Sequence, residues 1–125
     1  MIYTGYFAKV KQYNALGLTA ISIARWSPKW WAITACEPRL APSANLLQAY
    51  KQNLVDEAEY ERIYTEELKK IDVESIIKEL ESINPKGVVL CCYEKSDSFC
   101  HRHILSKYVN SLHLLDKDME EVRLC

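Results

Sequence analysis

Reactive side chains concentrate in two short runs of the sequence, Gly87–Glu94 and Phe99–His103. The first reads Gly-Val-Val-Leu-Cys-Cys-Tyr-Glu and the second Phe-Cys-His-Arg-His. A cysteine at the start of a helix and beside a cation has a lowered pKa, and an adjacent histidine can serve as its base. The pattern therefore makes Cys100 or Cys92 a candidate nucleophile, with His101 as the base.

The spacing leaves a second interpretation of these cysteines open. In phosphatase and rhodanese loops an arginine follows the cysteine by several residues and wraps an anion around the thiolate. Here Arg102 follows Cys100 by two residues and Cys92 by ten, so neither cysteine has that loop. In the alternative, both thiols are small buried core side chains.

The start of the expected helix also favours an anion. Its first-turn amides, its positive dipole end and Arg102 together suit a phosphate or a carboxylate. Glu94 would orient an arginine or act as an acid–base group. Alternatively, Asp97 and Ser98 only cap the helix and Arg102 pairs with Glu94.

A metal site would use Cys92, Cys100 and His101. Zinc sites normally contain paired ligands such as Cys-x-x-Cys, and these residues lack that pairing. We therefore predict no metal site, and the sequence identifies no cofactor.

Local structure predicts how the reactive residues are placed. The β-branched run 87–92 is typical of a buried strand, 95–98 of a polar turn with an N-cap, and 98–110 of a helix. This order puts the cysteine and histidine at the carboxyl end of a strand, where open α/β sheets bind ligands.

Helical spacing divides the residues of that helix between two sides. Cys100 and His101 lie four residues before Ile104 and Leu105, so both should face the sheet. Arg102 falls at the edge of the apolar stripe, whose later members are Tyr108 and Leu112, and His103 falls on the solvent side.

A second cluster follows an earlier strand, 18–24. Arg25 leaves its carboxyl end and begins a long segment, 25–42, that contains the three tryptophans and three of the four prolines. If the two strands are parallel neighbours, Arg25 and Arg102 would hold one anion while Trp26, Trp30 or Trp31 stacks on a planar ring. In the alternative, the tryptophans only pin the segment and Arg25 pairs with Glu94.

Other predicted elements alternate between strand and helix. We expect strands at 1–6 and 121–124 and helices at 7–16, 43–50, 56–71 and 72–83, the last three capped by Ser43, Asp56 and Asp72. Apolar stripes on the longer helices extend to Ile71 and Ile83. Tyr6 ends the first strand and is a candidate ligand-binding residue. The alternation predicts an α/β fold in a single domain, 1–125, with a small, mostly parallel sheet flanked by helices.

Composition excludes several classes of protein. Hydrophobic residues make up 49% and charged residues 26%, which is typical of a globular domain rather than a disordered chain. The net charge is −1 and basic residues are interspersed with acidic ones, so we predict no nucleic-acid partner and no membrane association. The N-terminus lacks a secretory signal and the five cysteines have no framework spacing, which favours a cytoplasmic protein with reduced thiols.

Several motifs occur together along the chain. They are Arg25-Trp-Ser-Pro-Lys-Trp-Trp31 after a strand, Leu40-Ala-Pro-Ser43 before a helix, tyrosines at 60 and 64, and Cys92-Tyr-Glu94 with Cys100-His-Arg102. In this combination the sequence resembles the domain-of-unknown-function-488 (DUF488) family. The resemblance implies a Rossmann-like, three-layer domain without an established activity. By motif match it implies site residues at Arg25, Cys92, Glu94, Cys100, His101 and Arg102.

Two functions remain open. The first is an intracellular domain that binds a small anionic ligand, a nucleotide or a base, at the strand carboxyl ends, with Cys100 and His101 carrying any catalysis. The second is a non-catalytic module that sequesters a nucleotide signal or a protein partner through the tryptophan-rich segment. The reaction and the oligomeric state are not predicted.

Overall fold

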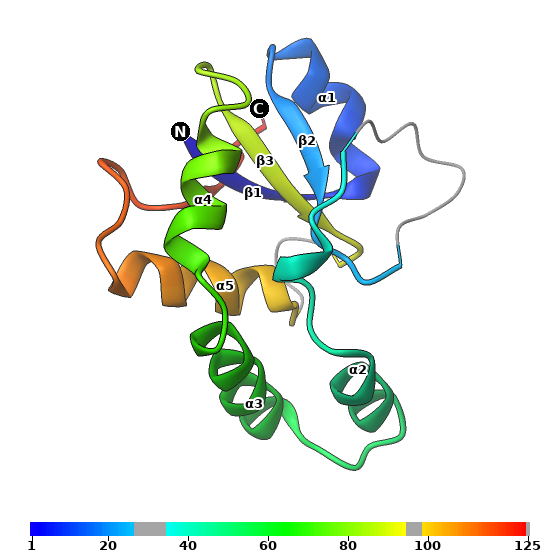
Figure 1. Ribbon diagram of the computed structural model, residues 1–125. Helices are drawn as coiled ribbons and strands as arrows, with labels where there is room; N and C mark the ends of the chain where they lie inside the picture. The colour runs from blue at the N-terminus through cyan, green and yellow to red at the C-terminus, as the bar shows by residue number, and fades with distance from the viewer. Residues whose placement is uncertain (27–34, 95–98, 125) are drawn as a thin grey trace.

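The computed structural model describes residues 1–26, 35–94 and 99–124 and contains a four-stranded parallel sheet with helices on both faces (Figure 1). The strands have the order β2-β3-β1-β4. Their bounds are Ile2–Tyr6 for β1, Thr19–Ser22 for β2, Val88–Cys92 for β3 and Glu120–Glu121 for β4. The predicted α/β class with a small parallel sheet is confirmed.

Helices occupy most of the remaining described chain. The α-helices are α1 (Val10–Ala15), α2 (Ala44–Lys51), α3 (Glu57–Lys69), α4 (Val73–Glu81) and α5 (His101–Ser111), and short 3-10 helices are η1 (Phe7–Lys9) and η2 (Pro38–Leu40). Ser43, Asp56 and Asp72 cap α2, α3 and α4 as predicted, each by accepting a backbone N–H.

Strand β3 is the centre of the sheet. All five of its residues are buried, and it pairs in parallel with β1 on one side and β2 on the other. Parallel strands covered on both faces are continuous apolar runs rather than alternating ones, as the Val-Val-Leu-Cys-Cys sequence is.

The two faces of the sheet have different covers. One face packs against η1 and α1, and the other packs against α3, α4 and α5. Cys91 belongs to the first cluster, whereas Cys92 faces α5. These adjacent cysteines therefore project to opposite faces of the sheet, as neighbouring residues of a strand do.

Several predicted boundaries are wrong. Strand β2 is shorter than 18–24, the last strand lies at 120–121 rather than 121–124, and η2 interrupts the long segment 25–42. Helix α5 begins at His101, and its N-cap is Cys100 without a side-chain capping bond. The predicted cap Ser98, like Trp30 and Trp31, lies outside the described residues.

The predicted apolar stripes extend one or two residues beyond the helix ends. Ile71, Ile83 and Leu112 were expected to pack but are 37%, 50% and 42% exposed. Each follows the last residue of its helix, so the periodicity that places a side chain on the core face no longer applies there. Tyr108 is half-buried against the core.

None of the described helices combines the length and apolar character needed to cross a lipid bilayer.

Arg102 connects α5 to the two-residue strand β4. Its side chain is fully buried, and its Nε and Nη2 donate to both carboxylate oxygens of Glu121 at 3.1 and 3.0 Å. The hydroxyl of Thr4, on β1, donates to the same carboxylate at 2.7 Å. A buried guanidinium needs such a partner because an unpaired charge is strongly destabilising in an apolar interior.

We predict that Glu121→Gln lowers the free energy of unfolding by about 2–3 kcal/mol, because it removes the counter-charge of a buried arginine while the carboxylate itself is partly exposed. The measurement is urea denaturation. Glu120→Gln, an exposed change on the same strand, is the matched control and should cost less than about 0.5 kcal/mol. Equal losses in the two variants would contradict the assignment.

Candidate functional site

The candidate site lies where β2 and β3 end and α5 begins (Figure 1). Because these strands are parallel neighbours, the segments that follow them emerge at the same edge of the sheet. This is the position at which open α/β sheets bind ligands.

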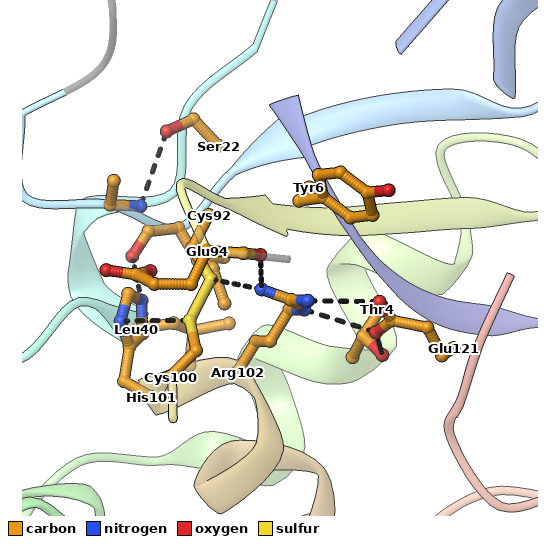
Figure 2. Close-up of a disulfide and its surroundings, with 12 residues drawn as sticks. Thr4, Tyr6, Ser22, Leu40, Cys92, Glu94, Cys100, His101, Arg102 and Glu121 are labelled. Atoms are coloured by element: carbon orange, nitrogen blue, oxygen red, sulfur yellow. Dashed lines mark hydrogen bonds and ion pairs between the residues drawn. A yellow bond between two sulfur atoms is a disulfide. The ribbon is translucent and has the colours of Figure 1, made fainter. Parts of the chain in front are cut away.

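Cys92 and Cys100 form a disulfide at this edge (Figure 2). The expectation of reduced thiols is therefore wrong for these two residues, whereas Cys91 is a buried thiol. Cys92 ends β3 and Cys100 precedes α5, so the return of the chain toward the same corner brings them together.

His101 is held by a backbone carbonyl of the neighbouring segment. Its Nε2 lies 2.9 Å from the carbonyl oxygen of Ile23. A carbonyl only accepts hydrogen bonds, so Nε2 carries the proton and Nδ1 presents a lone pair. Nδ1 lies 4.0 Å from the sulfur of Cys100.

The surroundings of His101 keep its ring neutral. The ring is buried and meets Tyr64 edge-on, with centroids 5.7 Å apart. Burial lowers the pKa of His101 to about 4, and the nearby Arg102 charge acts in the same direction. At neutral pH the corner thus contains a neutral imidazole beside a sulfur, with both residues facing the sheet as predicted.

Arg102 has a different place from the one predicted. It is fully buried rather than at the edge of the stripe, and its carboxylate partner is Glu121 instead of Glu94. Its Nη1 donates to the sulfur of Cys92 at 2.9 Å and to the backbone carbonyl of Glu94 at 2.6 Å (Figure 2). With all three guanidinium nitrogens donating to protein atoms, Arg102 positions the corner.

A pocket of about 410 Å³ opens beside the disulfide. Cys100 and His101 are among its buried lining residues, and Arg25 and Glu94 come from the segments after β2 and β3. Aromatic rings make up much of the rest. The other lining residues are Ala24, Trp26, Leu47, Gln48, Tyr50, Lys51, Tyr60, Tyr93 and Phe99.

Arg25 is an exposed residue anchored at the pocket. Its Nε and Nη2 both donate to the carbonyl of Pro42 at 3.1 Å, which fixes the guanidinium beside the start of α2. The next residue, Trp26, is 61% exposed, and its carbonyl accepts a hydrogen bond of 2.7 Å from the hydroxyl of Tyr93. The structure therefore places Arg25, Trp26, Glu94, Cys100 and His101 around one cavity.

Residues 19–113 match the family model DUF488-N3a, described as the active DUF488-N3 subclade, and the match covers more than half of the chain. The chain belongs to the DUF488 family. This confirms the resemblance seen in the sequence. No curated protein and no solved structure matches it. The matched range of this DUF488 protein contains every residue that lines the pocket, whereas Glu121 lies outside it.

Tyr6 and His103 of the DUF488 protein do not lie where the sequence predicts them. The guanidinium carbon of Arg102 lies 5.8 Å from the ring centroid of Tyr6. Tyr6 also borders a separate hollow with Lys9 and Tyr13. Strand β1 is separated from β2 by β3, so the end of β1 does not reach the pocket. His103, expected in solvent, is half-buried.

The sequence interpretation missed the aromatic wall that α2 and α3 contribute. The ring centroids of Tyr50, on α2, and Tyr60, on α3, lie 5.0 Å apart, and the ring of Phe99 lies 5.3 Å from that of Tyr60. The available signal was the use of tyrosine rather than leucine in an apolar stripe, since a buried tyrosine brings a polar group that needs a partner.

We predict that this DUF488 protein loses stability as the pH falls from about 6.5 toward 4. The pKa of His101 in the folded state, about 4, is below the ordinary value of 6.5, so the unfolded chain binds the proton more readily in this range. The stabilisation is complete above pH 6.5, and about 2 kcal/mol of it is lost between pH 7 and pH 5.

Urea denaturation at several pH values measures this loss, and His101→Gln should flatten the dependence. His113→Asn, an exposed change beyond the end of α5, is the control and should retain the wild-type slope. A wild-type slope in His101→Gln would show that other groups cause the loss.

Proposed function

We propose that this DUF488 protein is an enzyme that binds a small anionic ligand with a planar ring, a nucleotide or a base-bearing compound, and acts on it with Cys100 and His101. The observation that carries the proposal is the pocket itself. It combines a cation, aromatic walls and a corner where a sulfur lies beside an imidazole, in about 410 Å³. Ligand pockets for small molecules typically measure about 300–1,000 Å³ and are mostly apolar with a few polar groups.

The aromatic lining supports a planar ring as part of the ligand. Tyr50, Tyr60 and Phe99 form a continuous group with ring centroids 5.0 to 5.5 Å apart. Trp26 and Tyr93 add exposed rings at the opening. A flat heterocycle gains both apolar burial and stacking against such walls.

The charges at the opening support an anion. Arg25 and Lys51 line the pocket together, and a guanidinium presents several donors in a fork that fits phosphate or carboxylate oxygens. Pro42 already holds one edge of Arg25, so less side-chain freedom is lost when a ligand binds.

Cys100 and His101 supply the chemistry once the disulfide is reduced. The Nδ1 lone pair faces the sulfur and can accept the thiol proton as the sulfur attacks, so that Cys100 reacts as a thiolate, the nucleophilic form of cysteine. Glu94 lines the pocket and is exposed, so it can serve as an acid–base group. The description of the matching subclade as active favours an enzyme.

A non-catalytic binding module is the second candidate, favoured by the exposure of Trp26, 61% of its surface. Large aromatic side chains that remain in solvent are frequent anchors of protein interfaces. In that case the pocket would sequester a nucleotide or the tryptophan would bind a partner protein, and the thiols would take no part.

The first test is titration of the reduced protein with nucleoside monophosphates, with binding measured by calorimetry. Arg25→Gln should weaken binding at least about tenfold, because it removes a charge-assisted hydrogen bond to the anion. Arg62→Gln, an exposed arginine on α3 outside the pocket, is the control and should bind like the wild type. No binding by the wild type, or equal binding by the two variants, would contradict the ligand assignment.

The second test separates the enzyme from the module. Iodoacetamide labelling of the reduced protein across pH, mapped by mass spectrometry, should modify Cys100 at lower pH than Cys36, and a bound nucleotide should protect Cys100 alone. A Cys100 that stays unmodified while nucleotides still bind would favour the module.

A further inference from the structure

We propose that Cys92, Cys100 and His101, with the disulfide reduced, bind one zinc ion whose remaining coordination position faces the pocket. The bound zinc would be the group that acts on the ligand. This inference rests on the proposed function only for the identity of that ligand. The sequence predicted no metal because the three residues lack a paired motif, but the fold brings their donor atoms together.

The donor atoms already converge. The two sulfurs and one histidine nitrogen lie within 4.8 Å of one another, and all three residues are buried. Tetrahedral zinc, with bonds of about 2.3 Å to sulfur and 2.0–2.1 Å to nitrogen, places its ligands roughly 3.5–3.8 Å apart. The 4.0 Å between Nδ1 and the sulfur of Cys100 is close to that spacing.

His101 has the orientation of a metal ligand. The carbonyl of Ile23 accepts the Nε2 proton and leaves the Nδ1 lone pair directed toward the cysteines. Histidines that bind metals almost always donate their other ring N–H to a carbonyl or a carboxylate, which fixes the tautomer and the ring.

The sulfur of Cys92 has a matching partner. The Nη1 of Arg102 donates to it at 2.9 Å, and a thiolate that binds a metal is commonly supported by such a donor. Glu121 balances the arginine charge, and two thiolates balance a divalent ion. A bound zinc would therefore add no net charge to this buried corner.

The backbone permits the two sulfurs to separate. The Cα atoms of Cys92 and Cys100 are 7.5 Å apart, whereas protein disulfides usually span about 4.4–6.8 Å. A small-molecule or protein dithiol supplies two electrons and two protons, is itself oxidised to a disulfide, and leaves two thiols. Zinc then displaces both thiol protons as the two zinc–sulfur bonds form.

The donor set and the open position define the type of site. Two thiolates and an imidazole favour zinc over magnesium or calcium, which prefer oxygen ligands. Cys100 and His101 line the pocket, so the fourth position opens toward the place proposed for the ligand. Three protein ligands with one open position are typical of catalytic rather than structural zinc.

The experiment uses the whole chain, reduced with a phosphine under anaerobic conditions and titrated with Co²⁺ and then Zn²⁺. We expect one equivalent of cobalt, with thiolate-to-cobalt charge-transfer absorption that zinc abolishes. Cys92→Ser and Cys100→Ser should each lose that absorption and bind at least tenfold more weakly. Cys91→Ala changes the same strand on the opposite sheet face and should bind like the wild type.

Native mass spectrometry of the wild type tests metal binding even if the cysteine variants fail to fold. The reduced protein should gain one zinc and lose two protons, and the disulfide form should gain none. A reduced wild type that binds no cobalt or zinc, or cysteine variants that bind as tightly as the wild type, would overturn the site. Loss of metal binding with Arg25-dependent nucleotide binding intact would remove the zinc and leave the ligand assignment standing.

Discussion

The buried guanidinium of Arg102 is the interaction on which the site depends. It joins the first turn of α5 to the end of β3 through Cys92 and Glu94, and to β4 through Glu121. A buried charge of this kind is tolerated only with a full set of partners, so the edge strand β4, only two residues long, is required for the geometry of a corner on another strand. The match to the DUF488 family ends before Glu121, so the described fold adds a partner that the matched range does not contain.

A second interaction places the reactive nitrogen. The carbonyl of Ile23, just beyond β2, fixes the protonated nitrogen of His101 and thereby directs the other nitrogen toward Cys100. Strand β3 supplies Cys92 and the adjacent β2 segment supplies both this carbonyl and Arg25. Because β2 and β3 are parallel neighbours, groups nearly 70 residues apart in the sequence meet at one edge of the sheet.

Much of this arrangement was predictable from local patterns. The apolar run of β3, the helix caps and the alternation of elements indicated the fold, and helical spacing from Ile104 and Leu105 correctly turned Cys100 and His101 toward the sheet. The burial of Arg102 was not predictable, because periodicity placed it at the edge of the stripe and its partner lies on a distant strand. Tyr6 was misplaced because the strand order, which puts β3 between β1 and β2, cannot be inferred from residue spacing within a single segment. The proximity of Cys92 and Cys100 likewise depends on the position of α5 beside the end of β3.

The central claim is that the pocket beside Cys100 holds a small anionic ligand through Arg25. A crystal structure of the reduced protein with a nucleoside monophosphate at saturating concentration tests it most directly. We expect the phosphate within hydrogen-bonding distance of the Arg25 guanidinium and the base against Tyr50, Tyr60 and Phe99. A nucleotide bound elsewhere on the molecule, with this pocket left empty at saturation, would contradict it.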